Sequence, residues 1–162
     1  MLDTEEAILA GGCFWGVEYF LKRRPGVLKT EVGYCGGSLE HPTYEQVCSG
    51  QTGHVEAVRV VYEPSTLSFT DLVQYFFEVH DPTQTDGQGP DLGAQYASVI
   101  FYYDASQRDT ALALKDRLIQ KGYPVVTQIL PVSSFWPAKA DHQDYYQKTD
   151  QTPYCHCYMQ RF

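Results

Sequence analysis

The chain has 162 residues, of which 43% are hydrophobic and 14% aromatic, a composition that suits one domain with a single hydrophobic core. Its formal net charge of −8 argues against nucleic acid or an anionic membrane as a partner, because both would repel the surface, and no apolar run approaches a membrane span in length. The five cysteines follow an acidic N-terminal segment without a basic export signal, so we expect reduced thiols in a cytoplasmic protein.

The first predicted elements are a short strand and a helix, joined at ILAGGCFWGVEYF, residues 8–20. Two glycines allow a tight turn, apolar residues recur at helical spacing from Phe14 to Leu21, and KRRPG then ends the helix. Cys13 therefore lies at a helix N-terminus, where unpaired N–H groups and the helix dipole stabilise a thiolate. The spacing is equally consistent with a nucleophile and with a small buried side chain.

Phe14 and Trp15 follow this cysteine directly. Adjacent positions of a helix cannot both face one core, so one of the two rings is available to line an apolar pocket beside the sulfur.

The remaining elements alternate between strands and helices. Ser68, with Asp71 three residues later, forms a capping pattern, and Gly122 ends the last predicted helix. In chain order the patterns predict a short strand within 29–38, a strand over 54–64, a helix over 68–81, a strand over 94–104, a helix over 106–122 and a strand over 124–132.

Two long polar loops, residues 38–53 and 82–93, separate these elements, and loops of that length usually have a function or are disordered. The order of elements predicts an α+β fold, a two-layer plait with a ferredoxin-like β-α-β-β-α-β core whose helices pack on one face of a mixed sheet. We expect a single domain over residues 1–162, in which residues 133–162 form a long irregular C-terminal tail.

Glu56 is placed by alternation on the same strand face as Val58 and Val60. Arg59 lies on the other face. Burial disfavours the charged form of a carboxyl group, so Glu56 is a candidate general acid. An edge position in contact with water would explain the same pattern.

Tyr44 lies in the first long loop and Tyr96 at the start of a predicted strand, beside glycine-rich stretches, although their spacing does not separate them from structural tyrosines. Asp91, in GPDLG, is a candidate for holding a group at the site or for shaping a turn.

The tail contains the sequence CHC at Cys155, His156 and Cys157. A zinc site needs four ligands, and only Cys35, Cys48 and scattered histidines are available to complete one. A tail thiol that reaches a distant cysteine can instead exchange disulfides. Cys35 and Cys48 have no pairing pattern, and we interpret them as bystanders.

Two chemistries suit a cysteine at a helix start. A cysteine hydrolase needs a histidine base, for which the candidates are His54, His80 and His142. A thiol redox enzyme needs a proton donor for a departing oxygen and a second thiol to clear the oxidised cysteine, and Glu56 and the tail offer both.

The chain resembles the A-type peptide methionine sulfoxide reductases through motifs in the same order, from about residue 7 to residue 157: GCFWG, YEQVCSGQTGHVEAV, HDPTQ, GPDLGAQY and FWPA…HQDYY. The resemblance implies that Cys13 attacks the sulfoxide sulfur and that Glu56 protonates the sulfoxide oxygen. It further implies a sulfenic acid on Cys13, which a tail thiol converts to a disulfide.

The same resemblance assigns the surrounding residues. Phe14 and Trp15 would form the pocket for the terminal methyl group of the substrate. Tyr44 and Tyr96 would donate hydrogen bonds to the sulfoxide oxygen, with Asp91 as a support to the site.

Cys155 corresponds to the first resolving thiol, while the role of Cys157 stays open because the spacing departs from the family pattern. Other departures are Gly87 and Ala97, where the family usually has arginine, and Lys139 and Asp141, where it tends to have Glu and Tyr. They remove charge partners near the rim of the site.

We therefore expect a thiol-dependent oxidoreductase that reduces methionine S-sulfoxide, free or in proteins, and serves protein repair under oxidative stress. It would act as a monomer, without a metal or other cofactor, and thioredoxin or another dithiol would be the external reductant. A cysteine hydrolase and a zinc-dependent interaction module are the alternatives.

Overall fold

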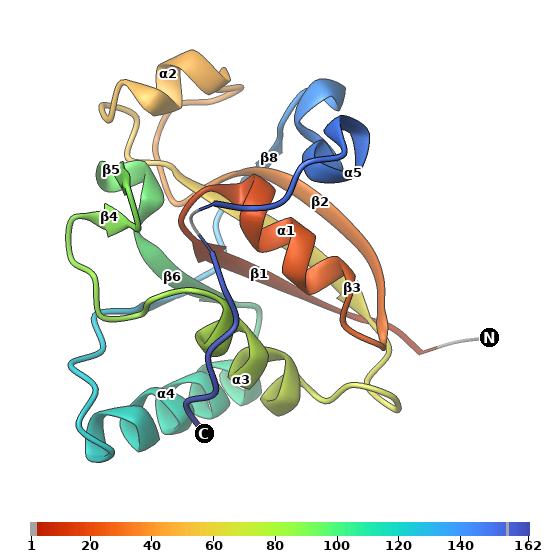
Figure 1. Ribbon diagram of the computed structural model, residues 1–162, viewed down its shortest axis with the longest axis vertical. Coiled ribbons are helices and arrows are strands. Elements are labelled where there is room, and N and C mark those ends of the chain that lie inside the picture. The colour runs from red at the N-terminus through yellow and green to blue at the C-terminus, as the bar shows by residue number, and fades with distance from the viewer. Residues whose placement is uncertain (1–2, 155) are drawn as a thin grey trace.

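Figure 1 shows the computed structural model, which describes residues 3–154 and 156–162. A curved sheet with helices over one side makes up most of it. In chain order the elements are β1 (Glu5–Gly11), α1 (Phe14–Lys22), β2 (Val27–Cys35), α2 (Tyr44–Cys48), β3 (Val55–Tyr62), α3 (Phe69–Val79), β4 (Gly87–Gln88), β5 (Asp91–Leu92), the 3₁₀ helix η1 (Ala94–Tyr96), β6 (Ser98–Tyr102), α4 (Ala105–Gln120), β7 (Gln128–Pro131), β8 (Phe135–Pro137), η2 (Ala140–His142) and α5 (Tyr145–Thr149).

The main sheet has the strand order β7-β6-β1-β3-β2-β8. Strand β1 pairs antiparallel with β3 and β6, and β2 pairs antiparallel with β3, so β1-α1-β2-β3-α3-β6 forms the predicted ferredoxin-like core. The parallel pairing of β6 with β7 makes the sheet mixed. The predicted fold class is confirmed, and α4, β7 and β8 extend the core.

The core lies between the sheet and the three long helices. Phe14 and Val17 from α1, Phe76 from α3 and Leu114 from α4 share one buried cluster with Leu9 of β1. Burial of each such side chain contributes about 1.5–3 kcal/mol. The helices therefore all cover the same face of the sheet, the face on which Glu56 also lies.

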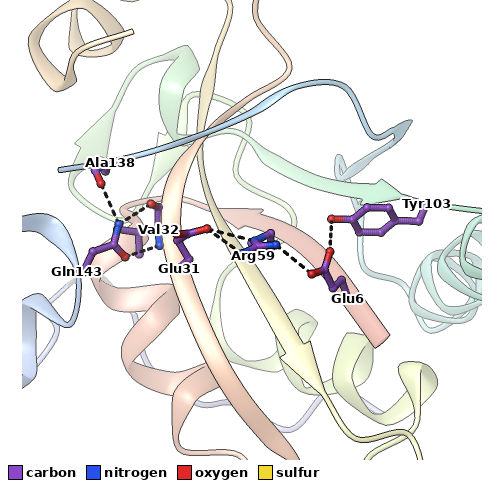
Figure 2. Close-up of polar contacts among 7 residues, drawn as sticks. All are labelled: Glu6, Glu31, Val32, Arg59, Tyr103, Ala138 and Gln143. Carbon is purple, nitrogen blue, oxygen red and sulfur yellow. Dashed lines mark hydrogen bonds and ion pairs between the residues drawn. The ribbon is translucent and has the colours of Figure 1, made fainter. Parts of the chain in front are cut away.

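The opposite face carries charge. Arg59 donates to Glu6 Oε1 at 2.9 Å and contacts Glu31 Oε1 at 3.0 Å through its two terminal nitrogens, and Tyr103 donates to Glu6 Oε2 at 3.2 Å (Figure 2). Arg59 and Glu56 thus point to opposite sides of β3, as strand alternation requires.

The helix caps follow the sequence. Ser68 Oγ accepts a hydrogen bond from the Asp71 N–H at 3.0 Å, which confirms the predicted cap of α3. Gly122, with φ +101°, follows α4 and its C-cap residue, and glycine adopts that conformation without strain.

The prediction of a loop over residues 38–53 is wrong in part, because this segment contains the helix α2. The Thr43 hydroxyl accepts from the Gln46 N–H at 3.2 Å, and the Gln46 side chain accepts from the Thr43 N–H at 2.9 Å. This reciprocal capping box stabilises a helix too short to show a period.

Three other boundaries also differ from the prediction. The second loop contains the small β4–β5 hairpin, and the strand predicted from residue 94 begins at Ser98, after η1. The last predicted strand is limited to Gln128–Pro131, because β6 pairs only with these four residues.

The tail is less irregular than predicted. Strand β8 pairs with β2, and Gln143 then extends this attachment. Its side-chain amide accepts from the Val32 N–H at 2.8 Å and donates to the Val32 carbonyl at 2.9 Å and the Ala138 carbonyl at 3.1 Å (Figure 2). The Gln143 amide thus makes the hydrogen bonds to Val32 that a further residue of β8 would make in the sheet.

In the part of the chain that the structure describes, none of the helices has the length and apolar character needed to cross a membrane.

Candidate functional site

Cys13 lies where β1 ends and α1 begins. Gly12 turns the chain with φ +97°, and Cys13 is the N-cap residue of α1, with its side chain 5% exposed. The Cys13 carbonyl accepts from the N–H groups of Gly16 at 3.1 Å and Val17 at 3.3 Å, the first bonds of the helix. The positive end of α1 therefore lies at this cysteine.

Glu56 lies beside this helix start. Its side chain is 1% exposed, and Oε1 accepts a hydrogen bond from the Phe14 N–H at 3.2 Å. Phe14 is the first helical residue, so this bond uses one of the donors that the start of a helix leaves without a partner in the helix. The buried carboxyl group of Glu56, on β3, is thereby held against the residue that directly follows Cys13.

Three tyrosines surround the carboxyl group. Burial, and next the negative charge of Glu56, raise the pKa values of Tyr34, Tyr44 and Tyr96 above their usual range. All three phenols therefore stay protonated near neutral pH and can donate hydrogen bonds. Tyr44 and Tyr96 were candidates from the sequence. Tyr34 was missed, although it lies opposite Glu56 in the β2–β3 pairing.

Phe14 and Trp15 have different surroundings. Phe14 is completely buried in the core, whereas Trp15 is only partly buried. Tyr145 stacks on Trp15 with ring centroids 3.8 Å apart, and the Trp15 indole N–H donates to His142 Nδ1 at 3.3 Å. Tyr44 stacks on His142 in turn, at 4.6 Å. No local sequence pattern indicates these contacts of His142 and Tyr145, which come from the tail.

A cavity of about 230 Å³ adjoins these rings. Tyr34, Tyr44 and His142 line it, together with Lys139 and Asp141, two of the positions where the chain departs from the family pattern. Another cavity, of about 540 Å³, is lined by residues of α1 and α5 and also includes Trp15. The smaller cavity is the one of these two that contacts Tyr34 and Tyr44, two of the three tyrosines around Glu56.

The other two departures lie near the β4–β5 hairpin. Gly87 has φ +154°, and a Cβ atom there would overlap the Asp91 carbonyl oxygen, so a larger residue would require the hairpin to shift. Ala97 is the C-cap residue of η1, directly after Tyr96.

Asp91 contacts the tail. Its Oδ1 accepts a hydrogen bond from the Tyr154 hydroxyl at 3.0 Å. Its negative charge also contributes, after burial and Glu56, to the raised pKa of Tyr96. Asp91 therefore lies between a site tyrosine and the tail.

Of the three histidines suggested for a hydrolase, His142 lies at the site, where its Nδ1 accepts from Trp15, whereas His54 and His80 are engaged elsewhere. His54 accepts from the Gly37 N–H at 3.0 Å and donates to the Leu39 carbonyl at 2.7 Å. His80 is held between the Phe76 carbonyl and Ser98 Oγ, each at 2.7 Å, and burial lowers its pKa to about 3.

The remaining cysteines have separate positions. Cys35 is buried, with its Sγ 3.8 Å from Ser133 Oγ. Cys48 lies beside Tyr44, and burial raises the pKa of its thiol. Cys157 is exposed. Cys155, the expected resolving residue, lies outside the described residues. Across residues 3–154 and 156–162, no group of three or more His, Cys, Asp or Glu side chains is arranged to hold a metal ion.

This arrangement suits one kind of reaction. A thiol at a helix start, a buried carboxyl group and neutral phenols can together bind an electrophile that must release a protonated oxygen.

Comparison with known proteins agrees with this chemistry. The family model described as peptide methionine sulfoxide reductase matches residues 5–162. MsrA of Thermus thermophilus is 49% identical over 155 residues, covering 95% of this chain and 88% of its own, and MsrA of Methanosarcina acetivorans is 50% identical over 147 residues, covering 89% and 78%. The solved methionine sulfoxide reductase A of Corynebacterium diphtheriae superposes with a TM-score of 0.83 at 35% identity, covering 93% of this chain and 78% of its own.

The matching family model, the relatives and the shared fold together show that this chain belongs to the peptide methionine sulfoxide reductases of the MsrA family.

Proposed function

We propose that this reductase acts on methionine S-sulfoxide, free or in proteins, with Cys13 as the nucleophile and Glu56 as the proton donor. The observation that carries the proposal is the 3.2 Å bond from the Phe14 N–H to Glu56, which fixes a buried carboxyl group one residue from the cysteine at the start of α1.

In the first step, the Cys13 sulfur attacks the sulfoxide sulfur while Glu56 delivers a proton to the oxygen. The sulfur–oxygen bond of the substrate breaks and oxygen passes to Cys13. Methionine leaves, and Cys13 becomes a sulfenic acid. The substrate is reduced by two electrons and Cys13 is oxidised by two.

The phenols assist this transfer. Tyr44 and Tyr96, whose pKa values are raised chiefly by burial, remain hydrogen-bond donors toward a negatively polarised oxygen. Tyr34 adds a third donor beside them. Trp15, the partly buried ring of the pair, supplies apolar surface for the methyl group, and the buried Phe14 ring packs beside it with centroids 6.3 Å apart. Asp91 supports the loop that precedes Tyr96.

In the second step, a tail thiol attacks the Cys13 sulfenic acid, a disulfide forms and water leaves. Cys155 is the first resolving residue, and Cys157 either passes the disulfide onward or takes no part. An external dithiol then reduces the disulfide, so the cycle needs no bound cofactor.

Thioredoxin is the proposed reductant. Yeast Mxr1, which shares this fold, has been solved in complex with Trx2. A thioredoxin-type reductant works in a reducing compartment, and on this ground we propose that the enzyme acts in the cytoplasm, as a monomer.

The test supplies the purified full-length protein with the separated S and R epimers of methionine sulfoxide, using thioredoxin, thioredoxin reductase and NADPH. We expect methionine from the S epimer alone, measured by chromatography, with equimolar NADPH consumption. A Cys155→Ser/Cys157→Ser variant should stop after about one turnover per molecule. Sustained turnover of that variant, or equal rates with both epimers, would contradict the proposal.

A further inference from the structure

The C-terminal segment passes over the N-terminal end of α1 and then runs beside α3 to the end of the chain (Figure 1, dark blue). Its last residues are bound to α3, because the Met159 N–H donates to the Glu78 carbonyl at 2.7 Å and the Arg161 N–H donates to Glu78 Oε2 at 2.9 Å. The end of the tail is therefore anchored some distance beyond the cysteines.

His156 is buried against the turn that carries the nucleophile. Its side chain is 6% exposed, and Nε2 lies 2.7 Å from the Gly11 carbonyl oxygen. A carbonyl oxygen only accepts, so Nε2 carries a hydrogen and donates. Gly11 precedes Cys13 by two residues, so this bond joins the tail directly to the strand end that positions Cys13.

Gly16 makes room for this ring. A Cβ atom on Gly16 would overlap Nδ1 of His156, and one on Gly12 would come within 3.3 Å of Nε2. Glycine is ordinarily unfavourable inside a helix, so its presence at position 16 of α1 has a steric reason. The second glycine of GCFWG and the imidazole occupy complementary space.

Tyr154 makes a second contact. Its hydroxyl donates to Asp91 Oδ1 at 3.0 Å and lies 3.3 Å from Oδ2. Asp91 belongs to β5, in the hairpin that leads to Tyr96. Two contacts, one with Asp91 and one with the Gly11 carbonyl, thus flank position 155 in the sequence.

We propose that Tyr154 and His156 are positioning residues, which seat the tail so that its thiol meets the oxidised Cys13. The inference rests on the proposed function, because it assigns a role in the second step of that cycle. A docked tail raises the effective concentration of the resolving thiol near Cys13 and so accelerates disulfide formation. The first step, oxygen transfer to Cys13, does not need the tail contacts.

The experiment separates the two steps. Fully reduced protein is mixed rapidly with one equivalent of methionine S-sulfoxide and quenched at intervals, and methionine, dimedone-labelled sulfenic acid and disulfide are quantified by mass spectrometry. Loss of one hydrogen bond should slow disulfide formation in Tyr154→Phe by about three- to tenfold, and loss of the buried bond and ring should slow it in His156→Ala by about tenfold or more. Both variants should form methionine at the wild-type rate and accumulate sulfenic acid.

Tyr158→Phe is the matched control. Like Tyr154→Phe, it removes a hydroxyl group from an exposed tail tyrosine, but the Tyr158 hydroxyl lies 3.5 Å from Glu78 Oε1 and not beside Asp91. Both steps should therefore be unchanged. Gly16→Ala should slow disulfide formation in the wild-type background, because the added Cβ would overlap the His156 ring. Combined with His156→Ala, it should cause little further slowing, because that ring is then absent.

Disulfide formation at the wild-type rate or faster in Tyr154→Phe and His156→Ala would overturn the inference, as would a slowed first step. Because Tyr154 is an exposed side chain, Tyr154→Phe decides the question even where His156→Ala folds poorly. A wild-type protein that forms no methionine would instead contradict the proposed function.

Discussion

Cys13→Ser is expected to abolish methionine formation. A serine hydroxyl is a far weaker nucleophile than a thiolate and cannot form the sulfenic acid or the disulfide, so the rate should fall below about one-thousandth of the wild-type value. The variant should fold normally, because serine is close to cysteine in size and is a preferred residue at the N-cap position that Cys13 occupies. The measurement is methionine produced per protein molecule in the presence of excess dithiothreitol.

Cys48→Ser is the control for this variant. Cys48 is a partly buried thiol near the tyrosines, whereas Cys13 is buried, and a serine at position 48 still offers Tyr44 a hydrogen-bonding group. Its rate should stay within about twofold of the wild type, in the range of a conservative exchange outside the reaction. If Cys13→Ser retained activity, or if only Cys48→Ser lost it, the assignment of Cys13 as the nucleophile would be wrong.

Glu56→Gln should be folded but slow. The glutamine oxygen can still accept the Phe14 N–H bond, so the start of α1 is preserved, but an amide cannot supply a proton. General acid catalysis contributes about 10²–10⁴-fold, and we expect a loss of that order in the rate of methionine formation in a single turnover. The reaction of Cys13 with a sulfoxide-independent reagent such as iodoacetamide should change far less.

Glu45→Gln provides the matched comparison, because Glu45 is an exposed carboxyl group on α2 next to Tyr44. It should leave the rate within about twofold, which separates proton donation from a general loss of negative charge. A normal rate for Glu56→Gln across neutral pH would remove Glu56 from the mechanism.

The sequence was informative where local patterns decide the structure. The helical spacing after Cys13 placed this residue at the start of α1, and strand alternation placed Glu56 on the face that the helices cover. Both follow from periods of 3.6 and 2 residues, which need no knowledge of distant partners.

Elements that depend on distant partners were not predictable in this way. Strand β8 has three residues and exists because β2 lies beside it, and the Gln143 amide completes that attachment through Val32, 111 residues earlier in the sequence. Tyr34 lies opposite Glu56 only because of the β2–β3 register, which the sequence pattern alone does not specify.

The position of the tail has the same origin. Asp91 was expected to support the site or to shape a turn, and the structure shows it accepting a hydrogen bond from Tyr154. His156, first considered as part of a metal-binding pattern, lies against Gly11 and Gly16. Neither contact has a local signal, since the partners are separated by more than 60 residues.

The most direct test of the proposed cycle is to mix the reduced protein with one equivalent of methionine S-sulfoxide, without reductant, and to count free thiols and map the disulfide by mass spectrometry. The account predicts one methionine formed, two thiols lost and a link between Cys13 and Cys155. An unchanged number of thiols, with no methionine formed, would contradict it.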